Sequence, residues 1–343
     1  MNLSANSSDR EEWIDAAKGI GIILVVLGHI WLIGPGQKII NSFHMPLFFF
    51  LSGYVFHFER YQGFRQFFGS KMNRILAPYL WFSVITYSYW LIVERWVSGN
   101  GISPLAAFLN IFKCQGADRY LPHNPALWFL PCLFVVEVLF YCLAKNKTGE
   151  YILALLLVIS VFGHSISHWI TENWPWTINI ALTGLVFYGM GFLLRRIDLG
   201  SGSSRRLLAL VFGVATALGL YLALENTFVI MAACIFGNFF YFYSAAFLNI
   251  IGIVAASVLM CKTRWLTFLG QNSLTIFALH FPIKRLVMGF SGLLLRMPLE
   301  EIKSSFLLSS LDTFVTLLLL LPLIHLVRTR FSFILGDRRL SQG

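Results

Sequence analysis

Long apolar segments follow one another along the whole chain, with only short polar stretches between them. An apolar run of about 20 residues can span the hydrocarbon core of a bilayer as a helix. Lipid offers the backbone no hydrogen-bond partner, and the sequence lacks the alternating pattern of a membrane barrel, so we predict helices. The predicted spans are 19–34, 43–58, 75–97, 126–144, 150–166, 177–194, 207–224, 240–261, 270–292 and 306–327.

The composition supports a membrane protein. Of the 343 residues, 57% are hydrophobic and 12% are charged, whereas about 25% of the residues in a soluble domain are charged. We therefore predict an all-α, polytopic membrane protein with about ten transmembrane helices. No polar stretch reaches the length of a soluble domain, so we predict one membrane-embedded domain over residues 1–343, with a polar tail at 1–12 and a basic tail at 328–343.

Two other apolar segments do not fit the pattern of a full span. Residues 103–113 are predicted to form an interfacial helix, and residues 226–239 a re-entrant piece. The start of the chain, MNLSANSSDREEW, lacks the apolar core of a signal peptide, so we expect the first span to act as the insertion signal. The five cysteines follow no metal-binding spacing, and we expect no metal.

The basic residues predict the orientation of the chain in the membrane. The net charge is +10, with 26 Lys and Arg residues, and most of them lie in segments on the same side as the N-terminus. The positive-inside rule then predicts that both termini are cytoplasmic. Lys284, Arg285, Arg296 and Lys303 fall on the opposite side, where they either serve an anionic group or only extend to the interface. No basic patch lies on a soluble module, so we expect no nucleic-acid binding.

The stretch from Lys18 to Gly53 places costly polar groups inside a short apolar hairpin. Lys18 and His29 are eleven residues apart, which is about 16 Å along a helix and nearly a whole number of turns, so they share a face. His44 begins the next span and can approach the same region. An intramembrane imidazole can accept a proton from a hydroxyl. The alternative for each histidine is a structural hydrogen bond to a neighbouring group.

A basic loop follows the hairpin and runs into the third predicted span. Its cations are Arg60, Arg65, Lys71 and Arg74. Several fixed cations at a membrane rim suit a polyanionic ligand such as the phosphates of a nucleotide. Topology signalling alone explains Arg60 and Arg65, whereas Arg74 stands directly before a span and favours a binding role.

Two later segments carry polar groups at membrane depth. In HNPALWFLPCLFVVEVLFY, Glu137 lies nine residues beyond Trp128, which is about 14 Å along a helix. A carboxylate at that depth is either functional or joins two helices through an ion pair or hydrogen bond. In LGQNSLTIFALHFPIKR, Asn272 and Ser273 open the ninth span, and His280 is a third intramembrane imidazole.

Five segments, taken in order, resemble the acyltransferase 3 family of membrane O-acyltransferases, and most of all its fucose 4-O-acetylase-like branch. They are WIDAAKGIGIILVVLGH, FHMPLFFFLSGYVF, RILAPY, ALWFLPCLF and LGQNSLTIFALHFPI. The resemblance covers roughly residues 12–330. It implies a membrane enzyme of about ten helices that transfers an acyl group, usually acetyl, from cytoplasmic acyl-CoA to a carbohydrate hydroxyl. It also implies a multi-pass protein of the bacterial inner (plasma) membrane.

The resemblance assigns some residues by their place in its motifs. The basic residue and histidine of the family's first helix correspond to Lys18 and His29, and its later basic pair to Lys71 and Arg74. Its histidine in span nine corresponds to His280. Two departures stand out: position 18 is Lys where many members have Arg, and ALWFLPCLFVVE differs from the W-S-L-x-x-E spacing of the peptidoglycan-acylating branch. We expect no appended SGNH-type hydrolase domain, so transfer would finish in this domain or on a separate partner.

The resulting hypothesis assigns three groups of residues. The catalytic residues are His29, His44 and Glu137, with His29 acting as the general base or as a transient acyl carrier. Acetyl-CoA, or another acyl-CoA, is held by Lys18, Lys71 and Arg74. The acceptor is bound by Trp128, Asn272, Ser273 and His280.

The expected partners and two alternative functions complete the hypothesis. The expected partners are a carbohydrate or lipid-linked glycan acceptor, membrane lipids and envelope-polysaccharide assembly proteins. One alternative is a proton-coupled transporter or exporter of a small solute or glycan precursor, although the sequence has no internal repeat. The other is a non-enzymatic assembly or receptor protein of the cell envelope.

Overall fold

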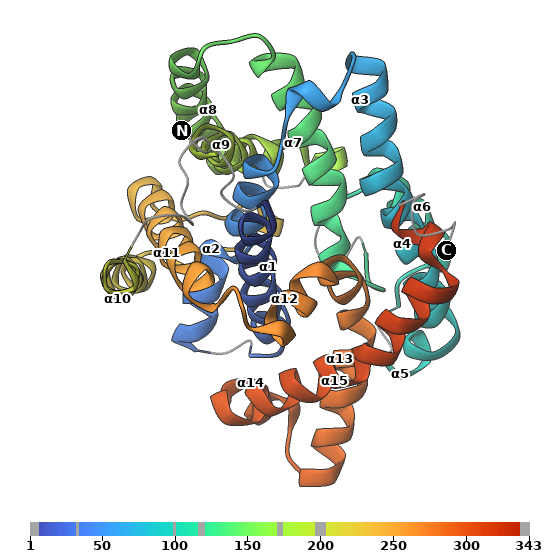
Figure 1. Cartoon of the computed structure of the whole chain (residues 1–343). Coiled ribbons are helices and arrows are strands. Elements are labelled where there is room, and N and C mark those ends of the chain that lie inside the picture. Colours follow the sequence, from blue (N-terminus) through green and yellow to red (C-terminus); the bar gives the residue numbers. More distant parts are fainter. Residues whose placement is uncertain are drawn as a thin grey trace.

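The computed structural model describes residues 7–31, 34–98, 101–115, 121–169, 174–195 and 204–336. Within these ranges the chain is almost entirely helical, and the bridge between Ile230 and Ile235 is the one extended pairing. The helices are α1 (Ser7–Ile30), α2 (Pro35–Tyr54), α3 (Phe64–Lys71), α4 (Ala77–Tyr89), α5 (Arg95–Ser98), α6 (Pro104–Lys113), α7 (Phe129–Ala144), α8 (Gly149–Trp169), α9 (Ile178–Leu194), α10 (Arg205–Glu225), α11 (Phe239–Met260), α12 (Arg264–Gln271), α13 (Ser273–Leu295), α14 (Leu299–Ser304) and α15 (Phe306–Arg330) (Figure 1).

The fold confirms an all-α polytopic membrane protein. Nine of the described segments are long and apolar enough to cross a bilayer. The predicted span 43–58 corresponds to α2, a 20-residue helix that is not among these nine segments and is buried by its neighbours over most of its length. A helix surrounded by protein rather than lipid can carry polar groups such as His44 at lower cost. The ends of both predicted tails lie outside the described residues.

Two pieces of the sequence prediction are refined by the structure. Residues 103–113 form a helix as expected, α6. The segment 226–239 folds back on itself through the Ile230–Ile235 bridge and a short 3-10 turn, Met231–Ala233. Asn226 holds this fold, since its Nδ2 donates to the Phe236 carbonyl at 3.0 Å and its Oδ1 accepts from the Asn238 amide at 2.8 Å.

Helix α1 lies at the centre of the assembly (Figure 1), where it packs against α2, α11, α12, α13 and α15. Glycine allows its closest crossing: a Cβ on Gly19 would lie 2.2 Å from the Leu266 carbonyl oxygen, and one on Gly270 would lie 1.8 Å from that of Asp15. A side chain at either position would separate the two backbones, so this crossing depends on glycine. The close approach of α12 sets the position of α1, and α1 carries His29.

The helices divide into an inner and an outer group. More than 60% of the span is buried in α1, in α11, and in the spans that contain α7 and α9, but only 22% in α8 and 17% in α10. The side chains exposed on the outer helices are large and apolar, such as Val158 and Leu210. An apolar outer surface is what a bilayer requires, and it leaves the inner group to hold polar chemistry.

The third span contains two π-helical turns, Met72–Leu76 and Trp90–Glu94. A π-turn shifts the side chains that follow it around the helix axis, and such turns occur frequently at functional sites. The first lies directly after Lys71 and contains Arg74, and the second ends on Glu94. Each π-turn therefore contains a charged side chain, and both turns belong to the same continuous helix.

Candidate active site

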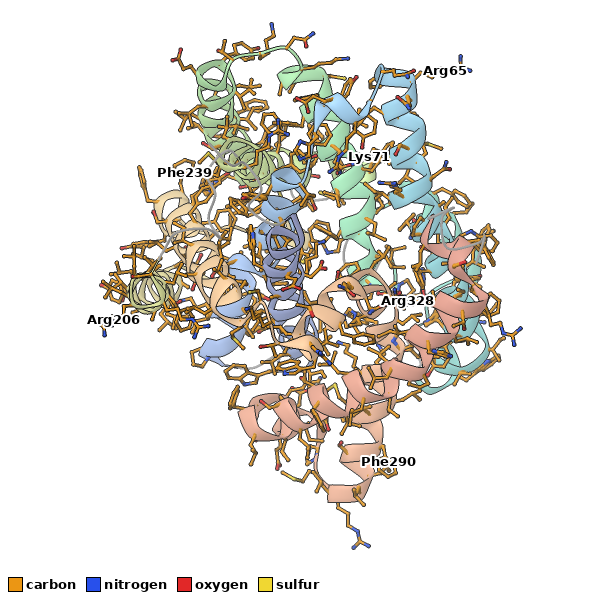
Figure 2. The ribbon with its side chains drawn as sticks, viewed as in Figure 1. Arg65, Lys71, Arg206, Phe239, Phe290 and Arg328 are labelled. Carbon is orange, nitrogen blue, oxygen red and sulfur yellow. The ribbon has the colours of Figure 1, made fainter. Side chains whose placement is uncertain are left out.

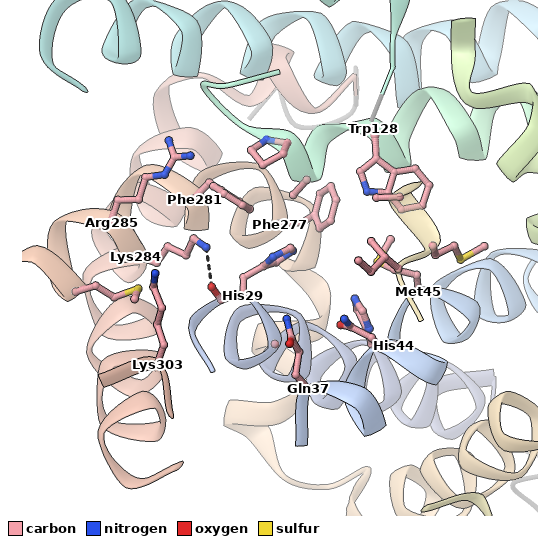
Figure 3. A pocket seen from close by; sticks show the side chains of 18 of the residues that line it. His29, Gln37, His44, Met45, Trp128, Phe277, Phe281, Lys284, Arg285 and Lys303 are labelled. Atoms are coloured by element: carbon pink, nitrogen blue, oxygen red, sulfur yellow. Dashed lines mark hydrogen bonds between the residues drawn. The ribbon is translucent and has the colours of Figure 1, made fainter. Parts of the chain in front are cut away.

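A cavity of about 780 Å³ is lined by residues of α1, α2, α13, α14 and the segment that leads into α7 (Figure 3). The folded-back segment supplies another wall through Ile230, Met231 and Ala233. The volume lies in the range of small-molecule sites, about 300–1,000 Å³. Among the sequence-predicted site residues, His29, His44 and Trp128 line this cavity.

His29 meets His280 at the edge of the cavity. Their ring centroids are 5.2 Å apart with the rings tilted by 31°, and the Phe281 ring lies 4.9 Å from the His29 ring. Two predicted site histidines, one from α1 and one from α13, are thus brought together. His280 is fully buried, and its Nδ1 lies 2.7 Å from the Phe277 carbonyl oxygen.

Hydrogen bonds determine which nitrogen is basic in two of the histidines. The Nδ1 of His280 and the Nδ1 of His44 each lie 2.7 Å from a carbonyl oxygen, of Phe277 and of Ile40 respectively. A carbonyl oxygen can only accept, so in the neutral ring Nδ1 carries the proton and Nε2 keeps its lone pair. Within the described residues, the Nε2 of His280 is buried without a hydrogen-bond partner.

Lys284 ties α13 to the end of α1. Its Nζ donates to the His29 carbonyl at 2.7 Å (Figure 3) and lies 3.9 Å from the centroid of the Phe281 ring. The last carbonyl groups of a helix have no partner within it, and His29 stands in the last turn of α1. The ammonium therefore satisfies that helix end and fixes the backbone of His29. Its position in the sequence had indicated only a basic residue on the side opposite the termini.

An ion pair between Arg285 and Glu94 closes one end of the cavity. The Arg285 guanidinium also donates to the Pro122 carbonyl, with both Nη atoms 3.2 Å from that oxygen. The second carboxylate oxygen of Glu94 is buried and has no hydrogen-bond partner among the described residues. Sequence reasoning missed Glu94 because it lies near the end of a predicted span, and a π-turn is not visible in an apolar pattern.

Loop residues before α7 fix the position of Trp128. The Asn124 side chain donates to the Ala278 carbonyl of α13 at 2.7 Å. His123 is fully buried beside Tyr87, and burial lowers the pKa of its ring to about 3, with the nearby Arg285 acting in the same direction. The ring is therefore neutral in ordinary buffers. Trp128 itself is 5% exposed and faces the cavity.

Lys71 and Glu137 lie away from the cavity, in a second buried site. Their charged atoms are 2.8 Å apart, and the Tyr188 hydroxyl lies 3.5 Å from the other oxygen of Glu137. The rings of Phe56, Tyr61 and Phe67 surround the ammonium at 5.5–5.9 Å from their centroids. Figure 2 shows Lys71 between the helices, well away from Phe290 at the far end of α13.

The other predicted residues also lie outside the cavity lining. Lys18 is 3.6 Å from Asp15, and Arg74 is exposed on its π-turn. Asn272 bonds to the Phe268 carbonyl at 2.7 Å and accepts from Arg328 at 3.4 Å, and Ser273 begins α13 beside it. Together with Lys71 and Glu137, the roles given to these residues remain predictions. Among the described residues, no group of three or more His, Cys, Asp or Glu side chains could hold a metal ion.

Comparison with known proteins yields one family and two relatives. The family model described as "Acyltransferase domain" matches residues 11–332. The nodulation protein NolL of Mesorhizobium japonicum is 33% identical over 208 residues, which cover 55% of this chain and 49% of that protein. NolL of Sinorhizobium fredii is 44% identical over 66 residues, or 16% of this chain and 18% of that protein. The chain thus spans about half the length, or less, of the curated relatives it matches. No solved structure matches the chain.

Proposed function

We infer the activity from one premise: the chain belongs to the acyltransferase 3 family, whose domain covers nearly all of it. The protein is accordingly a membrane acyltransferase. We propose that it transfers an acyl group, acetyl first, from acyl-CoA to a carbohydrate hydroxyl of a cell-envelope or exported glycan. The observation that carries this proposal is the pair of histidines, His29 and His280, beside a cavity that Trp128 also lines.

His29 is proposed as the general base. The hydroxyl proton of the acceptor moves to a ring nitrogen of His29 while the hydroxyl oxygen forms a bond to the thioester carbonyl carbon. The carbon–sulfur bond then breaks, and the proton returns to the departing thiolate, so the products are the ester and free CoA. Acyl-CoA supplies the thioester in this scheme. A variant of the scheme places the acyl group briefly on His29 before the acceptor takes it.

The neighbours of His29 support a catalytic role rather than a purely structural one. Lys284 fixes the backbone of His29 without occupying its ring. His280 lies against the ring with its Nε2 free of described partners, so it can stabilise an imidazolium as the proton arrives. A structural histidine would be expected to have both nitrogens bonded.

The cavity lining suits a sugar. Aromatic faces such as Trp128 stack on the apolar face of a pyranose, and amides such as Gln37 and Asn41 bond to hydroxyl groups. Figure 3 shows Gln37 and His29 projecting into the same space. A lipid-linked glycan could reach this cavity from the bilayer. We place the protein in the bacterial inner membrane, with membrane lipids around it and envelope-polysaccharide assembly proteins as partners.

The donor is proposed to bind outside the cavity lining. Arg74, which is exposed on its π-turn, remains the first candidate for the CoA phosphates, with Lys18 second. Lys71 is less suited, since its ammonium is already engaged by Glu137 and enclosed by rings.

The test is acyl transfer by purified protein in lipid nanodiscs with acetyl-CoA and a set of glycosides, followed by mass spectrometry. Substitution His29→Ala should reduce transfer by about 100- to 10,000-fold, the usual contribution of a general base. His325→Ala, at an exposed intramembrane position on α15, is the matched control and should be close to wild type. Near-normal transfer by His29→Ala, with the protein folded, would overturn the assignment. Solute flux in vesicles without any acyl transfer would favour the transporter alternative.

A further inference from the structure

The wall of the cavity is incomplete along one edge of α13. Leu286 and Gly289 line the cavity and are also exposed at the surface of the molecule, with Leu286 52% exposed. Val93 of the third span lines the cavity as well and is 43% exposed. All three residues belong to segments that are long and apolar enough to cross a bilayer, so this edge opens toward lipid. We call Val93, Leu286 and Gly289 the lateral rim.

A glycine keeps the lateral rim open. A Cβ on Gly289 would have no described atom within 4 Å, whereas a Cβ on Gly28, which also lines the cavity, would lie 2.9 Å from the Ile40 side chain. Gly28 therefore allows close packing, and Gly289 leaves space unfilled. The Arg285–Glu94 ion pair joins α13 to the third span one turn earlier, about 6 Å along α13. The opening thus begins where that bridge ends.

An apolar surface leads away from the lateral rim. Leu286, Phe290 and Leu293 follow the spacing i, i+4, i+7 and share one face of α13, which we call the apolar stripe. They are 52%, 66% and 81% exposed. Figure 2 shows Phe290 near the far end of α13, on the outside of the bundle. An apolar chain that lies on this stripe in the bilayer is therefore led to the edge of the cavity.

The cavity behind the lateral rim offers hydrogen-bonding groups. The amides of Gln37 and Asn41 and the ring of His29 belong to its lining. Gly289 is five residues beyond Lys284, whose Nζ donates to the His29 carbonyl, and this separation is about 7.5 Å along α13. A polar head group that passes Gly289 thus arrives at the His29 end of the cavity. A molecule with a sugar head and an apolar tail matches both surfaces, whereas a free sugar makes no use of the apolar stripe.

From this arrangement we propose that the lateral rim is the entrance for a lipid-linked acceptor. The sugar passes Gly289 and presents a hydroxyl to His29, while the tail stays in the bilayer on the apolar stripe. This inference rests on the proposed acyl transfer and narrows its acceptor to glycans that carry a membrane anchor. The anchor also raises the local concentration of acceptor beside the rim.

Photo-crosslinking of the full-length protein in nanodiscs tests the entrance without requiring turnover. The probes are hexadecyl glycosides of glucose, galactose and fucose with a diazirine in the chain, and labelled residues are mapped by mass spectrometry. With at least one sugar, the label should concentrate on Leu286, Phe290 and Leu293. An excess of the unlabelled glycoside should displace it, and hexadecanol, which has the tail without the sugar, should not. Label spread evenly over outer helices such as α10, or displaced equally by hexadecanol, would reveal bulk lipid only and overturn the inference.

Closing the lateral rim tests its role in transfer. Gly289→Trp fills the open space and should lower kcat/KM for the hexadecyl glycoside by about tenfold or more, through a steric clash with the entering head group. The methyl glycoside of the same sugar should change little. Val93→Trp closes the rim from the other side and should have the same effect. Gly213→Trp on α10 is the matched control, because a Cβ there also has no described atom within 4 Å.

The outcomes separate the entrance from the proposed reaction. An equal loss for the hexadecyl and methyl glycosides, or no loss in either rim variant, would overturn the entrance and leave acyl transfer standing. Sugar-dependent labelling of the apolar stripe without acyl transfer to any glycoside would support the entrance and refute the proposed function.

Discussion

Two lysines within the helical bundle of this protein occupy opposite kinds of site. Lys71 pairs with Glu137 at 2.8 Å, and three aromatic rings surround its ammonium. Lys284 donates to a helix-end carbonyl, rests on one ring and lines a cavity of about 780 Å³. The first lysine is matched by an opposite charge in a packed site. The second lines open space next to a histidine.

The contrast shows why burial of a charge does not by itself identify a catalytic group. The loss of one partner of a packed ion pair destabilises the fold, because it leaves an unpaired charge in a low-dielectric region. A charge at a cavity wall is available to a ligand. By this criterion the Lys71–Glu137 pair joins α3 to α7, and the histidine–Lys284 site is where we propose that the chemistry takes place. Four predictions test this division.

The largest effect is expected from breaking the packed pair. Glu137→Ala leaves the Lys71 ammonium buried without its carboxylate and should cost about 3–5 kcal/mol, enough to lose most folded protein. Size-exclusion yield and thermal unfolding in detergent measure this loss, and Glu225→Ala, at an exposed position, is the control. The pair-replacing double variant Lys71→Met/Glu137→Leu should recover folded, active protein. If the double variant folds but has no transfer activity, Glu137 would instead have the catalytic role that its depth in the predicted span suggested.

The second prediction concerns Lys284. Lys284→Met removes the hydrogen bond to the His29 carbonyl and the contact of the ammonium with the Phe281 ring but keeps an unbranched side chain of similar length, so folding should persist. Loss of a positioning contact next to the base should lower kcat by about 10- to 100-fold. Steady-state transfer kinetics measure this, with Lys262→Met as an exposed control. Lys284→Arg, which can still donate to the carbonyl, should recover part of the rate. Full activity in Lys284→Met would show that Lys284 is not needed for catalysis.

A smaller effect is expected at His44. The Nδ1 of this ring is committed to the Ile40 carbonyl, which leaves Nε2 as the nitrogen for a substrate. His44→Phe keeps the ring volume and removes that acceptor, so KM for the acceptor should rise about tenfold while kcat changes little. The KM–kcat split distinguishes this from a structural role, which would lower the yield of folded protein. A collapse of kcat equal to that of His29→Ala would make His44 a second catalytic base.

The smallest effect is a dependence of stability on pH through His123. Burial lowers the pKa of this ring to about 3 in the folded protein, whereas an unfolded chain takes up the proton near a pH of about 6.5. Between these values the unfolded state binds more protons, so stability is full above about pH 6.5 and falls as the pH drops toward 3. His123→Leu should flatten the curve of Tm against pH between about 7 and 5, relative to wild type. An unchanged slope would mean that other groups dominate the acid response.

Much of the fold could be predicted from the apolar pattern, because the length of a span and the need to satisfy its backbone leave few choices in lipid. The same pattern could not reveal the break at Asn272, the π-turn that ends on Glu94, or the folded-back segment that walls the cavity. Contacts between segments far apart in the chain shape this region. The hydrogen bond from Asn124 to Ala278, for example, joins residues 154 positions apart.

The site was predictable in part. The spacing of Lys18 and His29, and the cost of an imidazole in a membrane helix, singled out α1 from local sequence alone, and His280 lies 5.2 Å from His29. Lys71 and Glu137 were assigned to different roles, yet they face each other as one pair. Sequence distance could not show this, because the two residues belong to separate helices and only the packing of α3 on α7 brings them together.

Hydropathy and helical periodicity are local properties, so the order of the residues is enough to establish a helical membrane protein with basic and imidazole groups inside its spans. The packing of the helices decides the rest. It determines which of those groups share a cavity and which charges pair with one another. Glycine contacts such as that of Gly19 with Leu266 set how closely the helices cross, and the crossing sets which side chains meet.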